Sequence, residues 1–218
     1  MTSFSGKKLT CIRGERVVFN DLDFSINEGE VLYLKGPNGS GKSTLLRLMA
    51  GLLRPVNGTL TWNNKNIYQD EGLFRSLTHY VGHQDAVKTA LTVEENLRFW
   101  AEMNSDIKEK STVQKALQEF SLDSFSTLPA RFLSAGQRKR LNLARLCTTW
   151  APLWLLDEPS NSLDSDSVNV LTAAISTHQK KGGIVAIATH ENLDVHSNSL
   201  DISMFTNFKI KSRDYDGW

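Results

Sequence analysis

The apolar positions near the N-terminus follow the period of two that a half-buried β-strand requires. Leu22, Phe24 and Ile26 alternate with polar residues, which predicts a strand with one face in the core. The segment Glu30–Lys35 instead holds four apolar residues in succession, a pattern that predicts a central strand covered on both faces. A short strand is expected over Thr59–Trp62, after an Asn-Gly turn.

A helical period follows the central strand. The glycine-rich segment Gly36–Gly41 ends the strand, and Leu45, Leu48, Met49 and Leu52 then recur at helical spacing. The sequence therefore predicts the order strand, glycine-rich loop, helix, with one face of the helix in the core.

Two capping boxes predict where later helices begin. Thr92 with Glu95 starts one helix, and Ser134 with Gln137 starts another. Apolar residues at helical spacing mark a short helix between them. We interpret the helix-rich stretch of about residues 85–150 as a helical subdomain inserted into an alternation of strands and helices.

The C-terminal part returns to buried strands. Leu153–Asp157 and Ile184–Thr189 are short apolar runs separated by a helix with an apolar face. Residues 202–210 alternate loosely, which favours a terminal hairpin. Strands that alternate with helices predict an α/β fold with a mostly parallel core sheet and an N-terminal antiparallel part. A chain of 218 residues suits a single domain, residues 1–218.

Composition and charge exclude some partners and compartments. A formal net charge of +1 gives no reason to expect nucleic acid as a partner. No stretch approaches the ~20 apolar residues of a membrane-spanning helix. No apolar segment follows Lys7 and Lys8, as a secretory signal would require. Cys11 and Cys147 lie far apart with no His or Cys at ligand spacing, which favours a reducing compartment over a disulfide framework or a zinc site.

The glycine-rich segment fits the phosphate-binding pattern G-x-x-x-x-G-K-[ST]. It comprises Gly36, Pro37, Asn38, Gly39, Ser40, Gly41, Lys42 and Ser43, followed by Thr44. Glycines allow backbone N–H groups to surround an anion, and the following helix directs its positive end at the same phosphates. Lys42 is expected to reach the β- and γ-phosphates, and the Ser43 hydroxyl to reach Mg²⁺. The pattern predicts a site for ATP and Mg²⁺.

Two carboxylates stand at the end of a buried strand. Burial of the charged Asp157 and Glu158 there costs free energy, which favours a functional role for them. We expect Asp157 to hold Mg²⁺, and Glu158 to act as the general base that polarises the attacking water. The alternative is a pair of solvated acids, and the phosphate loop earlier in the chain favours the catalytic interpretation.

These residues resemble the ABC ATPase family over nearly the whole chain. The segment Leu133-Ser134-Ala135-Gly136-Gln137 is similar to the family signature L-S-G-G-Q, with Ala135 in place of the first of its two glycines. The resemblance implies a P-loop NTPase fold of the ABC type. It also implies that Ser134, Ala135, Gly136 and Gln137 close the ATP site of a second copy of the chain in a head-to-tail dimer. Locally, Ser134 would cap the helix whose N-terminus faces that phosphate.

Three more positions match the family's order of motifs. Gln84 resembles the Q-loop glutamine, which contacts Mg²⁺ and water and senses the membrane partner. Ser162-Leu163-Asp164 resembles the D-loop, which acts across the dimer, and His190 resembles the switch histidine that contacts the γ-phosphate. His83 is interpreted as a structural or surface residue. The predicted catalytic set is Glu158, His190 and Gln84, the predicted metal contacts are Ser43, Gln84 and Asp157, and Asp164 is predicted to contact nucleotide.

One position departs from the family. The family places an aromatic residue upstream to stack on adenine, whereas the matching position here is Arg13. Arginine can stack on a base through its planar guanidinium group, and Phe19 is a second candidate for this contact. Base selectivity is then expected to be relaxed.

Four segments resemble the ATP-binding subunit of the cytochrome c biogenesis haem exporter. They are Gly82–Gln84, Lys88–Leu97, Leu133–Arg140 and Gly182–Val185. The resemblance implies peripheral attachment, at the cytoplasmic face of the bacterial inner membrane, to membrane-spanning subunits of a cytochrome c maturation complex. ATP hydrolysis would then drive haem export or the release of a haem-loaded chaperone.

Other functions stay open. The chain could be the ATPase subunit of another small ABC exporter. A non-transport ABC ATPase usually carries two nucleotide domains or long coiled-coil insertions, for which 218 residues leave no room. A regulator that binds nucleotide without hydrolysing it is disfavoured, because Glu158, Gln84 and His190 are all present.

Overall fold

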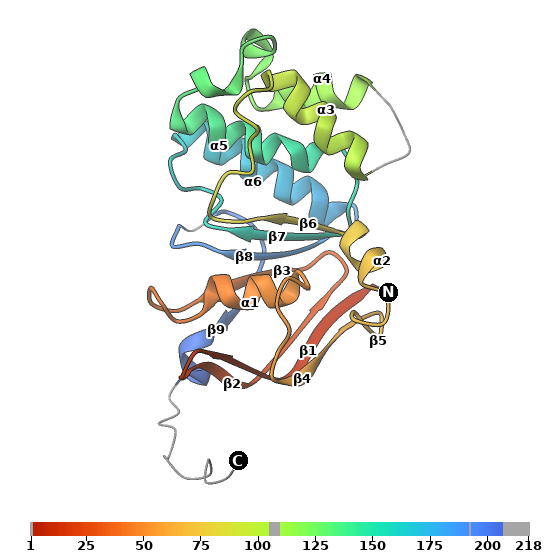
Figure 1. The fold of residues 1–218 in the computed structure, drawn as a ribbon, viewed down its shortest axis with the longest axis vertical. Coiled ribbons are helices and arrows are strands. Elements are labelled where there is room, and N and C mark those ends of the chain that lie inside the picture. The colour runs from red at the N-terminus through yellow and green to blue at the C-terminus, as the bar shows by residue number, and fades with distance from the viewer. Residues whose placement is uncertain (1, 105–109, 192, 207–218) are drawn as a thin grey trace.

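The computed structural model describes residues 2–104, 110–191 and 193–206, which form two sheets and six α-helices (Figure 1). The first sheet is antiparallel, in the order β2-β1-β4-β5. Its strands are β1 (Ser3–Arg13), β2 (Arg16–Asn27), β4 (Asn57–Trp62) and β5 (Lys65–Asn66). The second sheet is parallel, in the order β6-β7-β8-β3-β9. Its strands are β3 (Val31–Lys35), β6 (Thr78–Val81), β7 (Leu153–Asp157), β8 (Ile184–Ala188) and β9 (Asn198–Asp201).

Helix α1 (Lys42–Met49) lies between the two sheets (Figure 1). Its apolar residues, Leu45 and Leu48 among them, share one core with Phe4 of β1 and Leu34 of β3. The short helix α2 (Glu71–Ser76) adds Phe74 to this core. The two sheets therefore share one core with α1, which begins directly after the phosphate loop.

Four helices cover the other face of the parallel sheet (Figure 1). They are α3 (Val93–Asn104), α4 (Lys110–Glu119), α5 (Ala135–Ala144) and α6 (Ser165–Lys180). Strand β7 shows how both faces are filled: Leu153 and Leu155 belong to the core around α1, and Trp154 and Leu156 belong to the core beneath the helices. Helices α3 to α5 occupy the stretch between β6 and β7, and their status as a subdomain stays a prediction.

Both predicted capping boxes are confirmed. The backbone N–H of Ser134 donates to Oε1 of Gln137 (2.8 Å), and the N–H of Gln137 donates to Oγ of Ser134 (3.2 Å). Thr92 and Glu95 make the same reciprocal pair, at 2.8 and 3.2 Å. The helices α5 and α3 therefore start where the sequence predicts.

Two expectations were wrong. Helix α1 ends at Met49, and Gly51 takes a left-handed φ of 67° that ends the turn. Leu52 thus lies beyond the helix and is 54% exposed. The segment Ile202–Phe205 forms a 3₁₀-helix instead of a hairpin strand, because Asp201 caps it by accepting from the N–H of Ser203. Residues 207–210 of the expected hairpin lie outside the described residues.

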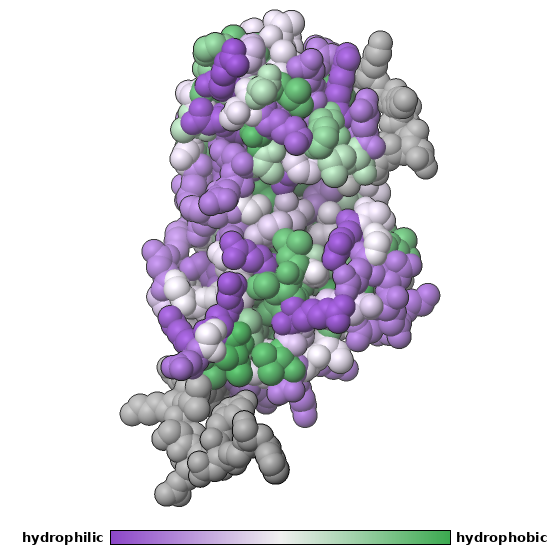
Figure 2. Space-filling model, in the orientation of Figure 1, coloured by the Kyte–Doolittle hydropathy of each residue, from purple (hydrophilic) through white to green (hydrophobic). Residues whose placement is uncertain are grey.

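The surface carries both polar and apolar groups. The face shown in Figure 2 is mostly polar, with small apolar patches over the helical end and over the antiparallel sheet. In the described parts of the chain, no helix combines the length and the apolar character that a bilayer span requires.

Candidate nucleotide-binding site

The loop between β3 and α1 depends on three glycines with positive φ. Gly36, Gly39 and Gly41 have φ values of 135°, 78° and 104°, which L-residues with side chains rarely adopt. Gly41 also has no room for a side chain, since a Cβ atom there would lie 2.6 Å from Cγ1 of Val18. Gly41 is the N-cap of α1 and offers no side-chain cap. The first N–H groups of α1 are therefore left for an anion.

Lys42 is folded back onto this loop. Its ammonium donates to the carbonyl oxygens of Gly36 (2.8 Å) and Pro37 (3.2 Å). The residue is only 8% exposed. The loop thus holds one positive charge at its centre, next to the N-terminus of α1, and both attract phosphate.

Ser43 and Asp157 join the loop to the end of β7. Oγ of Ser43 donates to Oδ1 of Asp157 at 2.9 Å. Asp157 is 1% exposed, and its second oxygen, Oδ2, has no hydrogen-bond partner among the described residues. A buried carboxylate oxygen without a partner, beside a serine hydroxyl, is an oxygen-donor arrangement that fits Mg²⁺.

Glu158 and His190 lie at the same edge of the parallel sheet. Glu158 has a left-handed φ of 49°, and its N–H donates to the carbonyl of Ala188 at the end of β8 (2.7 Å). Nε2 of His190 lies 3.7 Å from Oε1 of Glu158 and donates to Oδ1 of Asn38 at 2.9 Å. His190 therefore connects the carboxylate to the phosphate loop.

The phosphate loop, Glu158 and His190 line one cleft of about 680 Å³. Its lining residues are Arg13, Arg16, Val18, Asn38, Gly39, Gly41, Lys42, Ser43, Thr44, His83, Glu158, Asn161 and His190. A guanidinium group of Arg16 donates to the carbonyl of Gly39 at 3.4 Å. Arg13 and Arg16 pair across the β1–β2 hairpin, and both line the cleft. The cleft combines an anion-binding loop, a candidate metal site and a carboxylate that can act as a base.

Sequence comparisons agree with this geometry. A family model described as ABC transporter matches residues 19–161. The cytochrome c biogenesis ATP-binding export protein CcmA of Paramagnetospirillum magneticum is 48% identical over 196 residues, which cover 89% of this chain and 90% of that protein. This chain belongs to the CcmA family of ABC transporter ATPases. The CcmA protein of Rhodospirillum rubrum is 47% identical, over 87% of this chain and 81% of its own length.

Solved structures confirm the ABC ATPase fold. An ATP-binding subunit of an ABC transporter has a TM-score of 0.80 and 25% identity, covering 86% of this chain and 79% of its own. An ATP-binding cassette described as a dimer in a post-hydrolysis state, bound to ADP and Pi, has a TM-score of 0.77 and 25% identity, covering 86% and 88%. ATP is accordingly the nucleotide of this family.

The structure places two further candidates of the sequence analysis. Phe19 is fully buried in the core around α1 and does not line the cleft, so it is not an adenine contact. Gln84 is exposed, and the residue of its turn that lines the cleft is His83. His83 itself is exposed. Sequence reasoning missed the contributions of Arg16 and Asn161.

The ABC signature lies outside this cleft. Ser134 and Ala135 are exposed at the start of α5. A Cβ atom at Gly136 would lie 3.1 Å from the carbonyl oxygen of Ser162, so the signature and the D-loop are neighbours within the chain. Asp164 of the D-loop caps α6 by accepting from the N–H of Ser167 (2.8 Å), and the hydrogen bonds with Ser167 lower its pKa.

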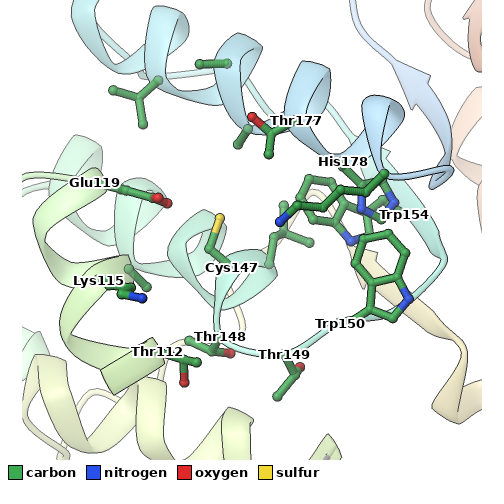
Figure 3. Close-up of a pocket in the computed structure, with 16 residues that line it drawn as sticks. Thr112, Lys115, Glu119, Cys147, Thr148, Thr149, Trp150, Trp154, Thr177 and His178 are labelled. Atoms are coloured by element: carbon green, nitrogen blue, oxygen red, sulfur yellow. The ribbon is translucent and has the colours of Figure 1, made fainter. Parts of the chain in front are cut away.

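A second cavity, of about 530 Å³, lies between α4 and α6 (Figure 3). Trp154 and His178 stack at its base with ring centroids 3.9 Å apart. Burial lowers the pKa of His178 to about 4 and raises the pKa of Cys147 to about 12, so neither a charged imidazole nor a thiolate is present near pH 7. None of the residues predicted for the ATP site lines this cavity. The cleft at the phosphate loop is therefore the better candidate for the chemistry.

Proposed function

We propose that this chain binds Mg²⁺-ATP in the cleft and hydrolyses it to power an export step of c-type cytochrome biogenesis. The observation that carries the proposal is the meeting, in one cleft, of the phosphate loop with Glu158 and His190, while Asp157 is hydrogen-bonded to Ser43 of that loop. The names of the relatives, cytochrome c biogenesis ATP-binding export proteins, support the assignment to cytochrome c biogenesis.

The proposed binding residues hold phosphate and metal. The N–H groups of residues 36–44 and the ammonium of Lys42 would surround the β- and γ-phosphates. Ser43 and Asp157 would hold Mg²⁺, with Gln84 brought in from its exposed turn. When bound, Mg²⁺ supplies positive charge that offsets the charge on the phosphate oxygens.

The proposed chemical step requires a base and a positioned water. Glu158 would accept a proton from the attacking water, because its carboxylate lies in the cleft at the end of a parallel strand. His190 would orient the γ-phosphate, since Nε2 already lies between Glu158 and Asn38 of the phosphate loop. The protein groups thus bind the phosphates, orient the γ-phosphate and accept one proton from the attacking water.

The nucleotide base would be held by arginine. Arg13 lines the cleft at the tip of the β1–β2 hairpin, and its guanidinium can stack on any purine. We expect GTP to bind within about tenfold of ATP, because stacking does not read the base edge. Arg13→Ala should weaken both nucleotides alike. Selective loss of ATP binding alone would contradict this assignment.

A second copy of the chain would complete the site. The segment Ser134-Ala135-Gly136-Gln137 is exposed at a helix N-terminus but does not line this chain's own cleft, which leaves it for the γ-phosphate on a partner. The solved cassette described as a dimer supports this arrangement. Asp164, beside the signature, would act across the same interface.

The partners would be membrane-spanning subunits of a cytochrome c maturation complex. We place the chain at the cytoplasmic face of the inner membrane, attached through those subunits, with haem export or release of a haem-loaded chaperone as the driven step. Affinity purification from detergent-solubilised membranes tests this part. Recovery of an unrelated permease would refute it and leave the ATPase assignment standing.

Hydrolysis is tested with three variants. Glu158→Gln should lower ATP turnover by about a hundredfold or more while ATP-bound dimers persist. Lys42→Ala should lose ATP affinity, because the central charge of the loop is removed. Glu102→Gln, an exposed carboxylate on α3, is the matched control and should behave as wild type. Wild-type turnover in Glu158→Gln would refute the general-base assignment.

A further inference from the structure

A pair of hydroxyl groups bridges the segments that follow β7 and β8. Oγ of Ser160 lies 3.1 Å from Oγ1 of Thr189, and either group can be the donor. The two residues are 29 positions apart in the chain. Ser160 is 1% exposed and Thr189 is 9% exposed. Each hydroxyl group is therefore satisfied by the other in a place where an unpaired polar group would cost free energy.

The bridge continues the pairing of the two strands past their ends. Asp157 and Ala188 form the last residue pair of the β7–β8 register, and the N–H of Glu158 donates to the carbonyl of Ala188 at 2.7 Å. From there the two segments leave the sheet, one toward α6 and the other toward β9. The hydroxyl bridge joins them again beyond the sheet.

Each hydroxyl group stands close in sequence to a residue of the proposed chemical step. Ser160 follows Glu158 by two positions, and Thr189 directly precedes His190. Nε2 of His190 lies 3.7 Å from Oε1 of Glu158. The bridge therefore ties together the two backbone segments from which these side chains extend.

The turn that carries Glu158 depends on such support. Glu158 has a φ of 49°, in the left-handed region that residues with side chains rarely adopt. A residue stays in this region only where the surrounding contacts hold it. On one side its N–H is bound to Ala188, and on the other Ser160 is bound to Thr189 and accepts from the N–H of Leu163 at 3.0 Å. The contacts that hold the turn also set the direction of the Glu158 carboxylate.

The same bridge stabilises the segment that carries His190. Oγ1 of Thr189 also accepts from the N–H of Glu191 at 3.1 Å, so one oxygen atom holds the backbone on both sides of His190. The imidazole side chain is 56% exposed. Because packing does little to place so exposed a side chain, its position depends on the backbone that carries it.

We infer that Ser160 and Thr189 are positioning residues, whose hydroxyl bridge holds the Glu158 carboxylate and the His190 imidazole in the relative placement that ATP hydrolysis requires. The inference rests on the proposed function, in which these two side chains act on the attacking water and the γ-phosphate. Neither Ser160 nor Thr189 lines the nucleotide cleft. Loss of the bridge should therefore slow the chemical step and leave ATP binding in place.

Hydroxyl-removing variants of the purified full chain test the bridge. Ser160→Ala and Thr189→Val each remove one hydroxyl group, whereas Thr189→Ser keeps it. We expect about tenfold lower kcat in the first two variants, because a small misplacement of reacting groups has a large effect on rate. KM and the affinity for a fluorescent ATP analogue should stay within about twofold of wild type. Thr189→Ser should recover most of kcat.

The chain contains a matched control pair. Oγ of Ser5 lies 2.9 Å from Oγ1 of Thr61, between β1 and β4. Neither residue lines the nucleotide cleft. Ser5→Ala and Thr61→Val remove the same chemical groups as the test variants and should keep the wild-type kcat. Thermal unfolding of all four variants separates a loss of stability from a loss of kcat.

Two double variants give the sharpest readout. Ser160→Ala with Thr189→Val should have the kcat of the slower single variant, because both changes remove the same bridge. Ser160→Ala added to Glu158→Gln should lower the residual turnover by less than about twofold, because the base that the bridge positions is already absent. If Thr189→Val fails to fold, Ser160→Ala decides the question, since it leaves the contact with Glu191 intact.

The inference is overturned by a wild-type kcat in Ser160→Ala, by losses that multiply in either double variant, or by a loss of analogue affinity in place of kcat. An equal loss of kcat in Ser5→Ala, or a Thr189→Ser variant as slow as Thr189→Val, would also overturn it. Glu158→Gln alone tests the proposed function, and full turnover there would refute that function itself. Loss of turnover in Glu158→Gln, with a wild-type kcat in Ser160→Ala, would refute only the positioning pair.

Discussion

Removing one hydroxyl group from the phosphate loop tests the contact between the loop and the end of β7. Oγ of Ser43 donates to Oδ1 of Asp157 at 2.9 Å, while Oδ2 has no partner among the described residues and the side chain is almost fully buried. Ser43→Ala leaves the carboxylate without this donor. A hydrogen bond to a charged group contributes about 1.5–3 kcal/mol. We therefore expect the free energy of unfolding of the nucleotide-free chain to fall by about 2 kcal/mol.

Thermal unfolding without nucleotide or Mg²⁺ measures this loss. For a chain of this size, 1 kcal/mol shifts Tm by about 2–4 °C, so Ser43→Ala should unfold about 4–8 °C below wild type. Ser43→Thr keeps the hydroxyl and is the matched control, expected close to wild type. A Tm for Ser43→Ala within about 1 °C of wild type would show that the bond adds nothing to the free chain.

Three further predictions concern packing and pH. Gly183→Ala places a Cβ atom 2.1 Å from Nε2 of His178, so urea unfolding should show a loss of about 1–3 kcal/mol; an unchanged midpoint would contradict the packing. Asn96→Leu removes four hydrogen bonds to the backbone and should lose about 3 kcal/mol in the same assay, against little change for the exposed Gln114→Ala; a loss below about 1 kcal/mol would count against the reasoning. Burial lowers the pKa values of His79 and His178 to about 4. Below about pH 6.5 the unfolded chain therefore binds protons that the folded chain does not. The free energy of unfolding should fall as pH drops from about 6.5 to about 4, by up to about 1.4 kcal/mol per pH unit for each histidine. A urea midpoint that stays constant over this range would rule this out.

The parallel sheet and the phosphate loop could be predicted because their signals are local. Strand β7 is apolar at four successive positions because both of its faces are covered, and the glycine pattern of the loop follows from its positive φ values. Helix α2 could not be predicted in this way. It spans only Glu71–Ser76, buries one residue, Phe74, and contains a glycine, so no periodicity marks it. Its one local signal is Asp70, which caps it by accepting from the N–H of Leu73.

The lining of the cleft could be predicted only in part. Strand β1 changes register with β2 at three places, between Gly6 and Ile12, and each change alters which side chains of the pair face the same way. Simple alternation therefore could not show that Phe19 enters the core while Val18 reaches the cleft. The choice between His83 and Gln84 depends on the path of a turn, which tertiary contacts such as the hydrogen bond from Asn142 to Asp85 decide.

The strand order of the parallel sheet also bears on how the chain is made. Strand β3, which leads into the phosphate loop, pairs with β8 on one side and β9 on the other, with Leu32 opposite both Ala186 and Asn198. On the ribosome the loop emerges long before either neighbour exists, and contacts of such sequence separation form late. The β1–β2 hairpin can form early, but the ATP site cannot. A growing chain should therefore be unable to bind ATP until β9 has been synthesised. An incompletely synthesised chain would then not hydrolyse ATP.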